Sequence, residues 1–345
     1  MEPMIEEADL TRTGLPSGSG PTSAANSATE KKTGKTRGKS PTGIALARLR
    51  KDKVAVTCAG IFVLFILIAI FAPLLAHLEG QSPTEKHFDL IDQYGFPTIG
   101  PTSEHWFGVE PRLGRDLFAR FAYGARPSLL VAGSVTIITT IIGVVVGLIT
   151  GFMGGWIDRI LSWVIDFVLS LPYLLFAIAV PAALLAVFIG ADAENASAED
   201  VATVRFYSLI IVLSFFGWAS LARLIRGEVL SLREREFISA AKVLGVPTRK
   251  VLFKELLPNL VAPIVISVSM ALPSYIVTEA GLTFLGVGLS EPTPSWGLTI
   301  SAAQNFYRAD PLYLWIPVLA ITILVLALSL LGDAIRDAFD PRTRR

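Results

Sequence analysis

Residues 236–259, EFISAAKVLGVPTRKVLFKELLPN, form a polar, helix-forming interruption between two long apolar runs of the sequence. Within it, Phe237, Ala240, Ala241 and Leu244 follow i, i+3, i+4, i+7 spacing, which predicts a helix with one apolar face and small residues at its centre. Such a face suits docking in a groove on a partner protein. It also fits an amphipathic connector lying on a membrane surface, although that would not require the alanines. The pattern leaves both interpretations open.

The rest of this segment contains the signals of a helical hairpin. Gly245 is placed to end the first helix, as a C-terminal glycine commonly does. Pro247 fits the first turn of a second helix over residues 248–256, and Pro258 is expected to stop that helix before the next apolar run.

A phosphate-binding loop is suggested by residues 34–40, GKTRGKS, but the match is poor. Three residues separate its glycines where the nucleotide-binding pattern has four, and no predicted strand precedes it. We therefore interpret it as part of a solvated basic tail, and we expect no cofactor in this chain.

Catalytic and metal-binding chemistry find equally little support in the sequence. His77, His87 and His105 all fall in one predicted loop, and neither a Ser–His pair nor a carboxylate pair occurs inside the apolar runs. The single cysteine, Cys58, excludes a disulfide framework within the chain. We predict no catalytic residue, no metal site and no enzyme activity, so a membrane-embedded hydrolase is disfavoured.

Composition assigns the chain to the integral membrane proteins. Its mean hydropathy is +0.58, and 52% of its residues are hydrophobic, which exceeds what soluble domains usually carry. The 30 Lys and Arg nearly balance the 29 Asp and Glu, so net charge gives no indication of a nucleic-acid partner. We therefore expect membrane lipid to surround the chain.

The apolar runs predict an all-α, polytopic helical bundle. A hydrocarbon core of about 30 Å needs about 20 apolar residues in a helix. Residues 1–43 are too poor in large apolar side chains to bury a core and are predicted to be a disordered basic tail, before a membrane domain over 44–345. The predicted transmembrane helices are six: 54–76, 129–151, 162–181, 206–225, 260–278 and 312–331.

The distribution of Lys and Arg orients these spans. Four cations precede the first span and three follow the last, so both termini are predicted to be cytoplasmic, as is the segment 226–258. The acidic loop 191–204 is predicted to lie outside. The outer loop 77–128 disagrees, because it contains four arginines, and we expect Glu110 and Asp116 to pair with them. Those arginines are Arg112, Arg115, Arg120 and Arg126.

Small residues in the second span predict close helix packing. Gly143, Gly147, Gly151 and Gly155 recur every four residues, so they lie near one helix face and would let another helix approach.

The third span carries an acid and two prolines. Asp166 is the one deeply placed acid that we identify, and pairing with Arg159 or a water-filled crevice would account for it. Pro172 and Pro181 predict a kink or a short helix at the outer surface.

Four stretches together resemble the dipeptide and oligopeptide permeases of ABC importers. Residues 46–76 resemble the family's N-terminal anchor, residues 107–130 its LGRD-containing signature, and residues 279–297 the stretch after its fifth span. The fourth stretch matches the family's cytoplasmic EAA coupling motif through Glu236, Ala240, Ala241, Gly245, Leu257, Pro258 and Asn259.

The resemblance implies a multi-pass permease subunit of a bacterial cell membrane. It would work with a second homologous permease subunit, two ATPase subunits that hydrolyse ATP, and an extracytoplasmic substrate-binding protein. Its coupling segment, including Phe237 and Leu244, would dock in an ATPase groove and transmit movement to the spans. The substrate would be a di- or oligopeptide, with nickel and glutathione as alternatives. An ion-coupled secondary transporter is the alternative from another class, although it would be expected to carry more membrane-buried charges.

Overall fold

The computed structural model describes residues 41–190 and 196–340, and its regular elements confirm the all-α prediction. Within these residues the only β-type pairings are two isolated bridges, Ile91 with Pro97 and Val109 with Asp116. The helices are α1 (Pro41–Leu49), α2 (Lys53–Glu79), η1 (Phe88–Leu90), α3 (Leu117–Met153), α4 (Gly155–Ser170), α5 (Tyr173–Phe188), α6 (Ala198–Arg233), α7 (Glu236–Val243), α8 (Thr248–Lys250), the π-helical turn η3 (Val251–Leu256), α9 (Leu257–Asn259), α10 (Val261–Phe284), α11 (Trp296–Ala303) and α12 (Pro311–Phe339).

Five of the described helices, α2, α3, α6, α10 and α12, are long and apolar enough to cross a membrane. The second predicted span is longer than expected, because α3 begins at Leu117 rather than near residue 129. Asp116 explains this start: its side chain accepts a hydrogen bond from the Ala119 amide at 2.7 Å and so caps the helix. The predicted outer loop 77–128 therefore shortens to residues 80–116.

The third predicted span is a broken helix. α4 and α5 meet at an angle of 87°, with the break at Leu171 and Pro172, so the kink predicted from Pro172 is confirmed. Pro172 has no amide hydrogen and disfavours a helical conformation in the residue before it. Pro181 lies inside α5 and does not interrupt it.

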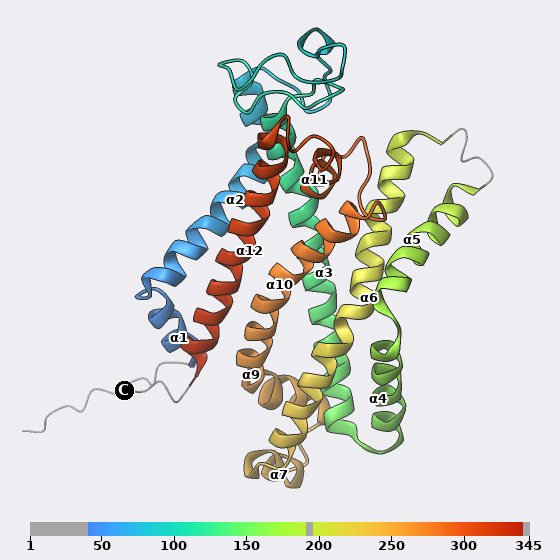
Figure 1. Cartoon of the computed structure of the whole chain (residues 1–345). Coiled ribbons are helices and arrows are strands. Elements are labelled where there is room, and N and C mark those ends of the chain that lie inside the picture. Colours follow the sequence, from blue (N-terminus) through green and yellow to red (C-terminus); the bar gives the residue numbers. More distant parts are fainter. Residues whose placement is uncertain (1–40, 191–195, 341–345) are drawn as a thin grey trace, which may run out of the picture. The chain divides into compact units, whose positions relative to one another are not determined.

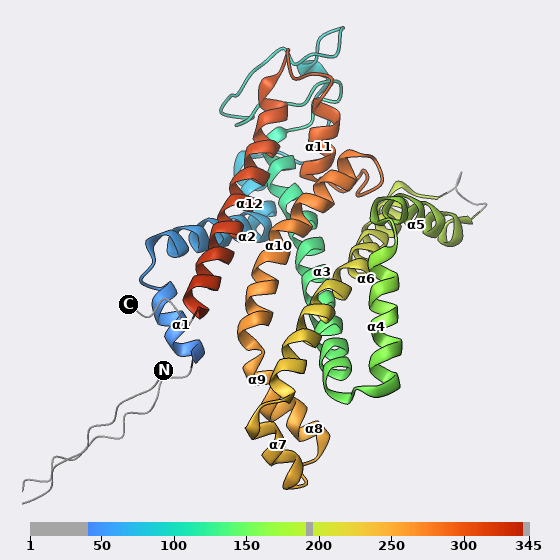
Figure 2. The same ribbon diagram turned by 60° about the horizontal axis from the view of Figure 1, so that its bottom comes forward.

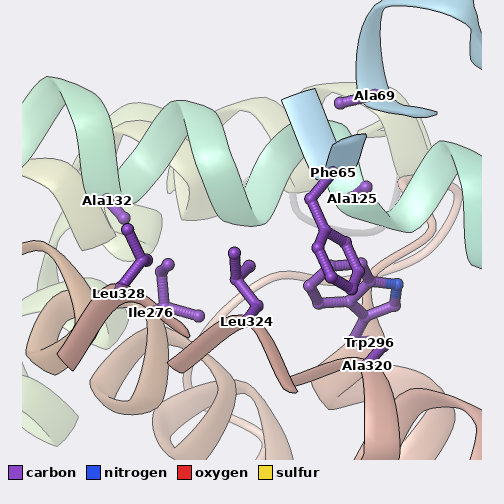
Figure 3. Close-up of a cluster of buried hydrophobic side chains, with 9 residues drawn as sticks. All are labelled: Phe65, Ala69, Ala125, Ala132, Ile276, Trp296, Ala320, Leu324 and Leu328. Atoms are coloured by element: carbon purple, nitrogen blue, oxygen red, sulfur yellow. The ribbon is translucent and has the colours of Figure 1, made fainter. Parts of the chain in front are cut away.

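An apolar core joins α2, α3, α10, α11 and α12 around Trp296 (Figure 3). The Trp296 ring is 1% exposed, contacts the Phe65 ring edge-on at 5.7 Å, and donates its indole N–H to the Phe121 carbonyl at 3.0 Å. A buried indole needs such an acceptor, and this one lies on α3. The short helix α11 is thereby fixed against the long helices.

Different segments of the chain lie at the two ends of the described bundle. At one end, Arg48 of α1 donates to the carbonyls of Ala338 and Asp340 at 3.3 Å, which holds α1 against the end of α12. The short helix α7 lies towards this end, whereas residues 80–116 and α11 lie towards the other (Figures 1 and 2).

An ionic cluster, the Glu110 network, lies at the end that carries residues 80–116; Glu110, Arg120 and Tyr313 are buried in it, and Glu291 is partly exposed. We define it as Glu110, Arg115, Arg120, Glu291 and Tyr313. Arg115 pairs with Glu110 and with Glu291 at 3.0 Å, and Arg120 pairs with the same two carboxylates at 3.4 and 2.7 Å. The Tyr313 hydroxyl donates to Glu110 at 3.3 Å, so the network ties α3 and α12 to the turn after α10.

The charges of this network shift the pKa values of Arg115 and Glu291. Burial lowers the pKa of Arg115, but Glu110 and Glu291 outweigh it and leave that pKa raised. Burial raises the pKa of Glu291, but Arg120 and Arg115 outweigh it and leave that pKa lowered.

The arginines of the outer loop are thus only partly paired as expected. Arg115 and Arg120 do pair with Glu110. Asp116, however, pairs with His105 at 2.8 Å rather than with an arginine, because its second oxygen is engaged in capping α3.

Several predictions fall on residues outside the described ranges. They concern the GKTRGKS stretch, the tail 1–43 except its last three residues, two acids of the predicted outer loop 191–204, and the C-terminal arginines. Residues 41–43 belong to α1 and so correct the boundary of the predicted tail.

Candidate functional site

The candidate site is the segment from α7 to α9, which links α6 to α10 at the end of the bundle near α1 (Figure 2). Two residues separate α6 from α7, and the backbone carbonyl of the second, Arg235, accepts hydrogen bonds from the amides of Ile238 and Ser239 at 3.1 and 3.2 Å. Glu236 occupies the first turn of α7, where its negative charge interacts favourably with the positive end of the helix dipole. The segment thus opens with a firmly defined helix start.

The turn after α7 has the geometry that the sequence predicted at Gly245. Its φ is +68°, a left-handed conformation that side-chain-bearing residues rarely adopt. The Leu244 amide makes the last regular helical bond, to the Ala240 carbonyl at 3.0 Å, and the Val246 amide donates to the Ala241 carbonyl at 3.0 Å, which is the 6→1 bond of a Schellman termination. Gly245 therefore ends α7 and reverses the chain.

The second half of the hairpin is less regular than predicted. The expected single helix over 248–256 consists of α8 followed by the wider turn η3, and Pro258 lies at the start of α9 instead of ending the segment. In a regular α-helix the Pro258 ring would clash with a carbonyl one turn earlier, and a π-turn relieves this crowding. The Leu257 amide accordingly donates five residues back, to Leu252.

An apolar cluster, the α7 anchor, attaches this hairpin to the long helices. Ile238 of α7 and Leu256 of η3 are fully buried in it, together with Ile225 and Val229 of α6. Its other fully buried or nearly buried members are Leu148, Val251 and Leu260. Leu148 lies in α3, and Ile264 of α10 packs against the cluster, so a displacement of α7 would act on α3, α6 and α10.

The opposite face of α7 is apolar but uncovered. Val243 and Leu244 are 88% and 81% exposed, Phe237 is 42% exposed, and Ala240 is also exposed. Exposed large apolar side chains at a helix end are typical of a protein interface. Phe237, Ala240 and Leu244 thus lie where a partner could reach them.

The other predicted site residues of the segment differ in exposure. Ala241 differs from the prediction: it is half-buried against the α7 anchor, one turn from Ile238, so it faces the long helices of this chain and not a partner. Leu257 is also half-buried there, whereas Glu236 and Pro258 are exposed.

Three of the four predicted glycines bring α3 against α6 beside this anchor. A Cβ added at Gly143, Gly147 or Gly151 would lie 2.9, 2.7 or 2.6 Å from the Cβ of Leu221, Ile225 or Val229, respectively. Side chains there would force the two helices apart. Gly155 is a correction, because α3 ends at Met153, and Gly155 begins α4 with a φ of +62° and open space around it.

Ion pairs connect α4 to α6 next to the glycines. Arg226 donates two hydrogen bonds to the Asp158 carboxylate, at 2.6 and 2.9 Å, and Arg223 pairs with Asp166. Asp166 is therefore paired, but the predicted partner, Arg159 of the same helix, is wrong. The partner is Arg223 of the neighbouring helix α6.

Sequence reasoning missed three residues of interest. Ile238 and Val243 were missed because α7 has apolar side chains on two sides, whereas the sequence analysis assigned it one apolar face. Glu279 in α10 was overlooked as a membrane-buried acid: it is fully buried and accepts a hydrogen bond from the Thr283 hydroxyl at 3.0 Å. The signal was available, because a glutamate inside an apolar run is unusual.

Comparison with known proteins supports the same assignment. Residues 143–345 match the family described as binding-protein-dependent transport system inner membrane component, and residues 40–92 match the N-terminal TM domain of oligopeptide transport permease C. The dipeptide transport system permease protein of Alkalihalophilus pseudofirmus is 36% identical over 307 residues, covering 88% of this chain and 91% of that protein. The glutathione transport system permease protein of Shigella dysenteriae is 36% identical over 297 residues, covering 86% and 89%. The chain belongs to the inner membrane components of binding-protein-dependent transport systems, the permease subunits of ABC importers.

Proposed function

We propose that this permease conducts short peptides and that α7 receives the movement that drives transport. The substrate proposal rests on the two relatives, whose names specify a dipeptide and the tripeptide glutathione. Both compounds are short peptides with free amino and carboxyl groups, so one class of substrate covers them.

The uncovered apolar face of α7 is the observation that carries the coupling proposal. Val243 and Leu244 project from the end of the bundle, while Ile238 on the other side of the helix is held in the α7 anchor. A partner that binds Val243 and Leu244 can therefore move α3, α6 and α10 through contacts that are already packed. We propose that this partner is an ATPase subunit, whose ATP-driven closure displaces α7.

The remaining partners follow from the family. We propose a second, homologous permease subunit, two ATPase subunits and an extracytoplasmic binding protein. The α7 end then faces the cytoplasm, where we propose that both termini also lie, and residues 80–116 face the binding protein. ATP is bound by the ATPase subunits and not by this chain, so Lys39→Ala in the GKTRGKS stretch is expected to leave nucleotide binding by the assembled complex unchanged.

Substrate-stimulated ATPase activity of the reconstituted complex tests the coupling role. Leu244→Asp places a charge on the exposed face, and this charge must lose water at the interface, at a cost of several kcal/mol if it stays unpaired. We expect at least a tenfold loss of stimulation and weaker retention of the ATPase, with normal membrane insertion. That cost exceeds typical coupling free energies of roughly 1 to 3 kcal/mol.

Two controls distinguish docking from misfolding. Leu244→Met keeps the apolar contact and should retain stimulation, and Lys250→Ala changes an exposed residue of α8 and should be silent. Full stimulation in Leu244→Asp would exclude this face as the ATPase contact. Transport of dipeptides and of glutathione by the same preparation then tests the substrate proposal separately.

A further inference from the structure

Pro73 leaves one carbonyl of α2 without its helical partner. Proline has no amide hydrogen, so the carbonyl four residues earlier, that of Ala69, receives no hydrogen bond from position 73. In the hydrocarbon core an unsatisfied backbone group is costly. Arg126 of α3 supplies the missing donor: its Nε donates to the Ala69 carbonyl at 2.5 Å, and its Nη2 donates to the Ile70 carbonyl at 2.9 Å.

These contacts satisfy carbonyls but do not neutralise the charge of Arg126. A guanidinium has five N–H donors, and its two carbonyl bonds leave the others available. Its further contact is with the Tyr123 ring, at 5.2 Å from the centroid, which is also uncharged. Among the described residues no carboxylate lies within ion-pairing distance of Arg126, whereas Arg115 and Arg120 each have two.

The guanidinium lies in a groove between α2 and α3. The groove has a volume of about 510 Å³ and is otherwise lined by Ile66, Ala69, Ile70, Leu129 and Leu130. Ile70 and Leu130 are both 59% exposed, as is usual for side chains that face lipid.

The depth of the groove makes its charge costly. Ala69 is ten residues from the end of α2, or about 15 Å at 1.5 Å per residue. Arg126 therefore faces the acyl region near the end that carries residues 80–116, where an uncompensated cation is unfavourable.

We propose that this groove binds an anionic phospholipid. Its phosphate, drawn towards the arginine by local thinning of the bilayer, would accept hydrogen bonds from the free donors of Arg126 and supply the counter-charge, while an acyl chain would lie along Ile66 and Leu130. Arginine suits this role because its planar fork binds carbonyls and a phosphate at the same time. The bound lipid would stabilise the contact between the proline-interrupted part of α2 and α3, in the leaflet opposite the α7 end.

Native mass spectrometry of the purified, delipidated protein, with the subunits that copurify, tests the proposal. Phosphatidylglycerol or phosphatidylcholine is added back at equal concentration, and one-lipid adducts are counted. We expect the wild type to prefer phosphatidylglycerol by about fivefold, the contribution typical of one cation facing an anionic lipid. Arg126→Gln keeps a donor for Ala69 but removes the charge, and it should reduce the preference to about unity.

A second variant separates the groove from the backbone contact. Leu130→Trp fills the groove without altering Arg126 and should reduce adducts of both lipids at least threefold. Ile137→Trp is the matched control, since Ile137 is 62% exposed two turns further along α3, and it should bind lipid like the wild type. Equal binding of the two lipids by the wild type, or unchanged adducts in Leu130→Trp, would overturn the proposal. Loss of copurifying subunits in Leu130→Trp would also overturn it, because a protein surface would then occupy the groove.

Discussion

Different kinds of contact stabilise the two ends of this permease: ion pairs at one end and apolar packing at the other. The Glu110 network is ionic and its centre is buried: Glu110 is 1% exposed and Arg120 is 2% exposed. The α7 anchor is apolar, with Ile238 and Leu256 fully buried and no ion pair among its members. Paired charges require a specific geometry, whereas apolar contacts are non-directional and tolerate small shifts. The difference indicates that the end carrying residues 80–116 is fixed in shape and that the α7 end can reposition while remaining packed.

The strongest test of this contrast removes one carboxylate from the Glu110 network. Glu110→Ala leaves Arg120 buried with a weakened counter-charge, and breaking a buried pair in this way typically costs about 3 to 5 kcal/mol. We expect a clear drop in the thermal unfolding temperature of the detergent-purified protein. Glu85→Ala, at an exposed position of the same loop, is the control. Equal unfolding temperatures for the two variants would contradict a structural role for the network.

At the α7 end, the matching change is Ile238→Ala. Truncation of a fully buried isoleucine costs about 2 to 5 kcal/mol, and here the loss should be local to the hairpin. Hydrogen exchange of the α7 amides should accelerate strongly, while exchange in α11 should not change. Val243→Ala, on the exposed face, should alter stability by no more than about 0.5 kcal/mol. If Val243→Ala destabilised α7 as much as Ile238→Ala, the assignment of inner and outer faces would be wrong.

The turn at Gly245 should be sensitive to backbone strain alone. An added Cβ meets no atom within 4 Å, so the cost of Gly245→Ala comes from its positive φ and should be about 1 kcal/mol. Gly281→Ala is the control within a helix, since it also has open space and a negative φ, and it should be neutral or slightly stabilising. Denaturant or thermal unfolding of both variants measures this difference. A stabilised Gly245→Ala would exclude the left-handed turn.

The smallest expected effect is a pH dependence of the Glu110 network. Arg120 and Arg115 outweigh burial and hold the pKa of Glu291 below its usual 4.5, so the stabilisation is complete above that value and is lost as pH falls through the lower, folded-state pKa. Its size should not exceed about 1 kcal/mol, because the Glu291 side chain is 45% exposed. Glu291→Gln should therefore unfold at a lower temperature than the wild type at pH 7, and the gap should close in strong acid. A gap that widens on acidification would refute this sign.

The sequence predicted the elements better than their contacts. Apolar runs reveal spans because the bilayer imposes a length, and Gly245 revealed its turn because few other residues adopt its φ. The inward position of Ala241 and the partner of Asp166 were inaccessible, because a helix that is apolar on two sides does not indicate which side packs. Arg223, on another helix, lies 57 residues from Asp166 along the chain. Such a pairing depends on which helices become neighbours, and local spacing does not encode that.

The hydrogen bonds between Arg48 and the end of α12 also determine the parity of the membrane crossings. The segment just before α2 and the end of α12 lie on the same side, which requires an even number of crossings between them, yet only five of the described helices are long enough to span a membrane alone. The bent pair α4 and α5 must therefore complete the sixth crossing, although each helix has 16 residues, or about 24 Å, and falls short of the hydrocarbon core by itself. Reporter domains fused to the two termini should consequently be found in the same compartment.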